Sequence, residues 1–132
     1  MSSAPISSHV MSRALCDVPR NHCDKLLKAI AERGGVIGAD LVGSHINPGY
    51  DAEGADVDGF SKHVLHLLRL CGTEGVCIGA DFDGTEKLPS GIRGASDVPK
   101  LYWNLKKHGV TEAVLDKIFF DNAYRYFAEN MR

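Results

Sequence analysis

The chain alternates short apolar runs with longer segments in which apolar residues recur at helical spacing. The short runs predict β-strands, and the longer segments predict α-helices. Strands are expected at residues 5–8, 36–42 and 75–80, and helices at residues 21–33, 56–71, 98–108, 111–119 and 122–131. This alternation is typical of βα units that build a parallel sheet, so the sequence predicts an α/β fold.

The helix expected at residues 56–71 shows the clearest pattern. Phe60, Val64 and Leu67 follow one another at intervals of three or four residues, and a glycine stands just past the end. Residues 43–55, rich in Gly, Asn, Pro and Asp, predict a loop. Thr111 is expected to cap the helix that begins there, since its hydroxyl can accept a backbone hydrogen bond.

Three βα units are too few to close a barrel. A (β/α)₈ barrel typically takes about 250 residues, whereas this chain has 132. The length therefore matches half of such a barrel, and the last predicted helices have no strand after them. We expect residues 1–132 to form one partial-barrel domain.

Composition excludes several classes of partner. The formal net charge is -2, so the chain has no basic footprint for nucleic acid. No run approaches the roughly 20 apolar residues that span a bilayer, and the first residues do not resemble a signal peptide. We therefore expect a cytoplasmic protein with no membrane partner. The four cysteines lack metal-binding spacing and are interpreted as reduced and mostly buried.

Two polar residues stand where a parallel sheet places its ligands. His9 follows the first predicted strand and Asp81 follows the third, while Asp40 falls inside the second. The carboxyl ends of parallel strands share one rim. An imidazole and a carboxylate there suit a metal and an activated water. The competing interpretation is a capping or surface histidine and a solvated Asp-x-Asp-Gly turn.

The other histidines give weaker signals. His63 and His66 lie three apart on one face of a predicted helix, which favours packing on a neighbour or exposure over a second metal site. His22, His45 and His108 are expected in loops or at helix ends, without partners that the sequence reveals.

Five collinear segments resemble the renal (membrane) dipeptidase family. The first is a Ser-His strand end followed by an Arg-Asn pair, and the others match a helix–strand junction, a His-x-x-His helix, a Gly-x-Asp-Phe-Asp-Gly turn and an Asn-x-x-Arg helix. These segments are residues 7–21, 32–38, 62–67, 79–84 and 121–127. Because they occur in the family's order and cover nearly the whole chain, the resemblance is specific.

The resemblance implies a fold and a chemistry. The family hydrolyses dipeptides with two zinc ions in a (β/α)₈ barrel, and this chain is similar to its C-terminal half. His9 matches a zinc ligand, and Arg20 matches the arginine that binds the substrate carboxylate, for which a planar guanidinium is suited. Asp81 matches the residue that carries the proton of the metal-bridging water. Asp83 and Gly84 are expected to shape the turn.

The chain also departs from the family pattern. Val10 and Met11 replace small residues, and Asp40 with Leu41 replaces an Asn followed by an aromatic residue. Both changes are expected near the cleft and would alter how substrate fits. The family's remaining metal ligands belong to segments before its sixth strand, which this chain does not match.

An incomplete ligand set leaves three hypotheses. The chain is part of a zinc dipeptidase that is inactive alone, or a module that binds small peptides without cleaving them, or a fragment that only self-assembles. Because a partial barrel leaves open sheet edges, we expect either a homo-oligomer or a separate N-terminal half as its partner.

Overall fold

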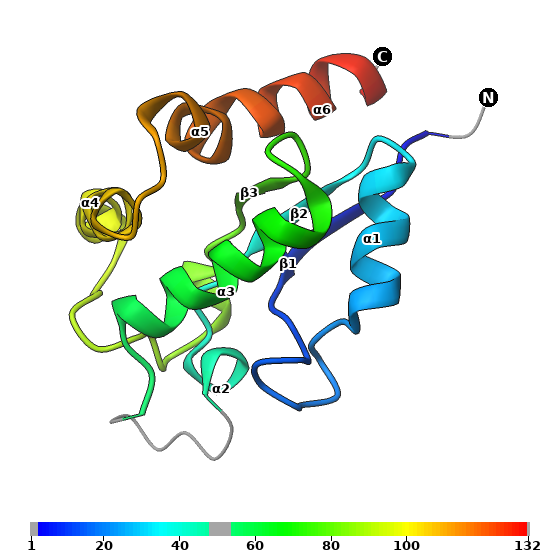
Figure 1. Cartoon of the computed structure of the whole chain (residues 1–132). Coiled ribbons are helices and arrows are strands. Elements are labelled where there is room, and N and C mark those ends of the chain that lie inside the picture. The colour runs from blue at the N-terminus through cyan, green and yellow to red at the C-terminus, as the bar shows by residue number, and fades with distance from the viewer. Residues whose placement is uncertain (1–2, 48–53, 132) are drawn as a thin grey trace.

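A three-stranded parallel sheet forms the centre of the chain (Figure 1). The computed structural model describes residues 3–47 and 54–131. The strands are β1 (Ile6–Val10), β2 (Val36–Ala39) and β3 (Val76–Ile78), in the order β1-β2-β3. This confirms the predicted α/β fold with parallel strands, although β2 and β3 end earlier than the sequence predicts.

Two crossover helices cover one face of the sheet. They are α1 (Asp24–Glu32) and α3 (Val57–Cys71), which also pack against each other. Strand residues Ile37 and Val76 contribute to the same core as Leu27 and Val64 of these helices. Since strand side chains alternate between faces, the neighbours Val36 and Cys77 point to the opposite face, where Tyr126 and Ala123 of the last helix cover them.

The C-terminal segment is one continuous helix after α4 (Val98–Lys107), instead of the two helices predicted at 111–119 and 122–131. It comprises α5 (Glu112–Asp116), a π-helical turn (Lys117–Asp121) and α6 (Asn122–Asn130), and Thr111 caps it as expected. The backbone stays helical between the two predicted pieces, where residues 117–121 form the π-helical turn.

A short helix, α2 (Gly43–Ile46), corrects the loop predicted at residues 43–55. Four residues are too few to display helical periodicity, so the pattern could not reveal it. Part of that predicted loop, residues 48–53, lies outside the described residues. Within the described part of the chain, no helix has the length and apolar character to cross a membrane.

Candidate functional site at the carboxyl ends of the strands

The first strand carries His9 on a β-bulge. Between Ser7 and Val10, β1 advances by three residues while β2 advances by two, from 37 to 39. Such an extra residue re-aims the side chains around it. The Ser8 hydroxyl lies 2.8 Å from Nδ1 of His9. The sequence predicted His9 just after the first strand. In the structure His9 lies inside the last part of that strand.

Two glycines make space for this bulge. A Cβ atom on Gly38 would lie 2.1 Å from the backbone carbonyl oxygen of Ser8, and one on Gly79 would lie 1.9 Å from the same atom. Both distances are far below van der Waals contact, and the colliding atom belongs to the backbone. Any side chain at either position would displace the segment that presents His9.

The turn after β3 holds Asp81 in a left-handed conformation. Asp81 has φ 59°, and it is the single non-glycine residue with positive φ in the described chain. Such conformations are strained and concentrate at functional sites. A Cβ on Gly84 would lie 2.2 Å from Oδ1 of Asp81. The glycine thus leaves room for the carboxylate, while Asp83 is exposed.

A buried asparagine holds the loop that delivers Arg20. Oδ1 of Asn21 accepts a hydrogen bond from the Met11 amide, and its Nδ2 donates to the carbonyls of Cys16 and His45. Asn21 is fully buried, whereas its neighbour Arg20 is exposed. The sequence contained Asn21 within the Arg-Asn motif but did not reveal that it ties three segments together.

These elements bring the three predicted residues to one place. An Nη2 donor of Arg20 lies 2.8 Å from Nε2 of His9. The same ring nitrogen lies 3.8 Å from Oδ2 of Asp81, and both side chains are about one-third exposed. The carboxyl ends of β1 and β3 therefore converge, with an imidazole, a guanidinium and a carboxylate open to solvent.

Asp40 and His45 form a second, buried pair at this end of the sheet. Asp40 directly follows β2, which corrects its predicted place inside the strand. One carboxylate oxygen lies 2.6 Å from Nδ1 of His45, and the other accepts a hydrogen bond from the Val42 amide. The side chain of Asp40 is fully buried, and His45, for which the sequence revealed no partner, provides a hydrogen-bond partner for it.

The apolar departures from the family pattern do not line the site. Val10, Met11 and Leu41 are completely buried in the core shared with the helices. These side chains thus pack in the interior, and the expectation that the departures alter substrate fit stays a prediction. Of the departures considered, Asp40 lies at the rim of the sheet, although its carboxylate is enclosed.

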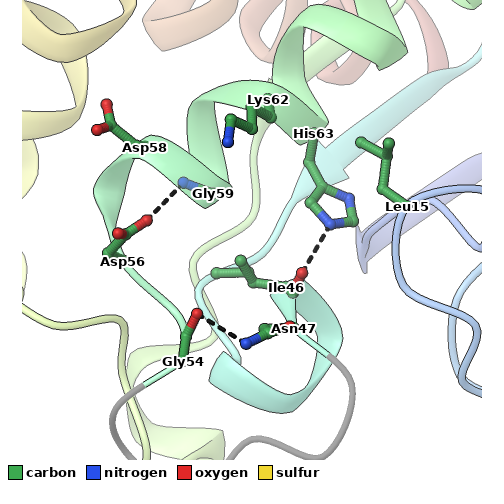
Figure 2. A pocket seen from close by; sticks show the side chains of 9 residues that line it. All are labelled: Leu15, Ile46, Asn47, Gly54, Asp56, Asp58, Gly59, Lys62 and His63. Atoms are coloured by element: carbon green, nitrogen blue, oxygen red, sulfur yellow. Dashed lines mark hydrogen bonds between the residues drawn. The ribbon is translucent and has the colours of Figure 1, made fainter.

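His63 is a packing residue. Its Nδ1 accepts the Ser12 amide hydrogen. Its Nε2 donates to the Ile46 carbonyl (Figure 2). Burial lowers the pKa of His63, which keeps the ring neutral. His66, on the same helix, pairs with Asp24 at 3.0 Å. A pocket beside the start of α3 includes His63 but none of the three site residues.

The two remaining histidines also have partners. Nε2 of His22 lies 3.1 Å from the Ser7 hydroxyl, and burial, followed by Arg20 and Arg13, lowers the pKa of His22. His108 pairs with the exposed Asp58 at 3.0 Å. Across residues 3–47 and 54–131, the structure contains no group of three or more His, Cys, Asp or Glu that could hold an ion.

Ligands and catalytic groups of parallel α/β folds lie at the carboxyl ends of the strands, which is where His9, Arg20 and Asp81 meet in this chain. The sequence matches the family described as Membrane dipeptidase (Peptidase family M19) over residues 1–131. The chain belongs to this family, which confirms the resemblance found from its motifs. At the level of the family, the activity is hydrolytic dipeptidase activity that depends on a metal.

Similar proteins extend well beyond the matched region. An uncharacterized protein of Klebsiella pneumoniae, from the region 5' of pqqA, is 31% identical over 91% of this chain and 44% of its own length. An uncharacterized dipeptidase of Schizosaccharomyces pombe is 29% identical over 89% of this chain and 29% of its own. The chain thus spans less than half the length of these relatives.

A solved structure shows the same fold. The metallopeptidase of Rhodobacter sphaeroides, in complex with a phosphinate mimic of the dipeptide L-Ala-D-Ala, superposes with a TM-score of 0.91 at 26% identity. The superposition covers 97% of this chain and 36% of that one. The elements described above therefore correspond to about a third of that solved structure.

Proposed function

We propose that this chain supplies the C-terminal part of a zinc-dependent dipeptidase site. The observation that carries the proposal is the convergence of His9, Arg20 and Asp81 at the carboxyl ends of β1 and β3. Two separate family segments, residues 7–21 and 79–84, supply these residues, and His9 lies within hydrogen-bond or ion-pair range of both Arg20 and Asp81.

Each residue receives a role that its chemistry permits. His9 offers a neutral imidazole nitrogen as a metal ligand. Arg20 binds the carboxylate of a dipeptide through its planar donors. Asp81 accepts a proton from the attacking water and returns it to the leaving amine. Gly84 leaves room for the Asp81 carboxylate, and Asp83 supports the turn. The dipeptide mimic bound to the Rhodobacter sphaeroides relative supports this substrate class.

The described residues match only part of a zinc site. A catalytic zinc typically takes about three protein ligands and a water, whereas the matched positions of this chain offer one ligand, His9, and one proton carrier, Asp81. We therefore derive no step through a metal held by this chain alone, and we propose that the chain is inactive without a partner. The family resemblance is the basis for proposing zinc as the particular metal.

The surface supports a need for a partner. Among the described residues, β1 and β3 each pair with β2 and leave their outer edges open. The last helix exposes a stripe of large apolar side chains, 47% to 71% accessible, that consists of Phe120, Tyr124, Phe127 and Met131. We propose that residues 1–132 form half of a (β/α)₈ barrel that assembles with a separate N-terminal half or with a second copy.

A second candidate function uses the same residues without hydrolysis. Arg20 and Asp81 both face solvent at the rim, so the chain could recognise the two charged ends of a small peptide with no metal. Binding without turnover would favour this module, and neither binding nor turnover would favour a self-assembling fragment.

Mixing experiments separate these functions. The purified chain is assayed for dipeptide hydrolysis alone and together with the N-terminal segment of a family member. We expect turnover in the mixture only, and we expect light scattering to show an oligomer or complex. Peptide binding by the chain alone, without turnover in the mixture, would instead support the binding module. A stable monomer that does not associate with that segment would contradict the half-barrel assembly.

A further inference from the structure

The ring of His9 is held at both nitrogens by groups with different hydrogen-bonding abilities. Nε2 lies 2.8 Å from Nη2 of Arg20, and Nδ1 lies 2.8 Å from the hydroxyl of Ser8. A guanidinium can only donate hydrogen bonds, whereas a hydroxyl can donate or accept. These two contacts together determine where the ring proton resides.

Arg20 requires Nε2 to act as the acceptor. In a neutral imidazole the other nitrogen then carries the proton, so Nδ1–H donates to the Ser8 hydroxyl. Asp81 does not oppose this arrangement, because its Oδ2 lies 3.8 Å from Nε2, beyond hydrogen-bond distance. The lone pair of Nε2 therefore points toward Arg20, at the rim that the ring shares with Asp81.

The bulge explains how neighbouring residues can make this contact. Side chains of consecutive residues in a regular strand point to opposite faces. Ser8 and His9 occupy the irregular step between Ser7 and Val10, and their side chains meet. Gly38 and Gly79 permit this geometry, since a side chain on either would collide with the Ser8 carbonyl. The strand distortion thus brings the serine hydroxyl against the ring.

We propose that Ser8 is a positioning residue. Its hydroxyl accepts from Nδ1–H and so holds the His9 ring in the orientation where the unprotonated Nε2 accepts from Arg20. Histidines that bind metals depend on such a partner at the other ring nitrogen, which fixes ring orientation and tautomer. The use of an unprotonated Nε2 as a metal ligand rests on the proposed function. The tautomer itself is a property of the metal-free chain.

The test reads the ring nitrogens directly. The full chain is labelled with ¹⁵N, freed of metal with a chelator, and studied by long-range ¹H–¹⁵N NMR at a pH where imidazole is neutral. The H9Q variant identifies the signals of His9. In the wild-type chain we expect a protonated Nδ1 and a bare Nε2. A wild-type ring protonated at Nε2 would overturn the proposal.

Three variants isolate the contribution of Ser8. In S8A we expect the Nδ1–H signal to broaden or disappear and both nitrogen shifts to move toward averaged values, while S8T restores the wild-type spectrum. S7A is the matched control, because Ser7 contacts His22 and should leave the His9 signals unchanged. Amide spectra verify that each variant is folded.

The outcomes distinguish this inference from the proposed function. An S8A spectrum with unchanged His9 nitrogens would reject the positioning role even if the assembled enzyme hydrolyses dipeptides. Conversely, a Ser8-dependent Nδ1–H tautomer in a chain that never supports hydrolysis would retain the tautomer and reject the dipeptidase assignment.

Discussion

The two ends of the same three strands are built in opposite ways. At the amino end, Val36, Cys77 and Tyr126 pack together, and the buried Asn122 donates to the carbonyls of Thr73 and Val76. This end is closed by side chains that serve packing and backbone hydrogen bonding.

The carboxyl end instead accepts local strain and open polar groups. It contains a β-bulge, an aspartate with φ 59°, and glycines where side chains would collide with the site. His9 and Asp81 remain about one-third exposed. The amino end and the helical layer stabilise the sheet. Because of this, the carboxyl end can hold strained residues and polar groups that are open to solvent.

Substitution of Gly79 should have the largest effect on stability. In G79A the new methyl group would lie 1.9 Å from the Ser8 carbonyl, and a backbone atom cannot move as a flexible side chain can. We expect the free energy of unfolding to fall by about 3 kcal/mol, the upper range for overpacking. Urea denaturation measures it.

Gly94 provides the control for this substitution. Its backbone is extended and its Cβ position faces open space, so G94A should leave the urea midpoint close to that of the wild-type chain. Equal midpoints for G79A and G94A would show that the bulge is not tightly enclosed.

Two buried asparagines, Asn122 at the amino end of the sheet and Asn21 at the carboxyl end, test the difference between the ends. In N122A two carbonyls lose their donor, and we expect global stability to fall by about 2 kcal/mol. In N21A we expect the main change to be faster amide exchange in the segment that includes Met11, which loses its acceptor. Urea denaturation measures the stability of N122A, and amide hydrogen exchange measures the local change in N21A. Faster exchange throughout the sheet in N21A would contradict a local role.

Acid should produce a smaller effect through His63. Its folded-state pKa is lowered, chiefly by burial, so the unfolded chain binds the proton more readily. Stability is therefore complete above the unfolded pKa of about 6.5 and declines as pH falls below it. In H63Q, which cannot titrate, the urea midpoint should fall less between about pH 7.5 and 5.5. An unchanged pH dependence would contradict this.

The sequence predicted what depends on side-chain patterns. The periodicity of Phe60, Val64 and Leu67 identified α3, and the rule that parallel strands share a rim predicted that His9 and Asp81 would meet. These features follow from burial and chain direction, which a single sequence displays.

What depends on backbone detail could not be predicted. The bulge at Ser8, the left-handed Asp81 and the π turn before Asn122 arise from local geometry that tertiary packing selects. Gly38 and Gly79 belong to the matched sequence segments. Their shared role, which is to leave space for the Ser8 carbonyl oxygen, appears only in the folded chain. The role of Asn21 was hidden for the same reason.

A single-chain chimera tests most directly whether these residues form a dipeptidase site. The matching segment of the Rhodobacter sphaeroides metallopeptidase is replaced by this chain, and kcat/KM for a dipeptide is measured. We predict that the chimera hydrolyses the dipeptide, that D81N lowers kcat/KM by about 10²- to 10⁴-fold, and that D83N has little effect. A folded chimera without activity, or one equally active with D81N, would contradict the assignment.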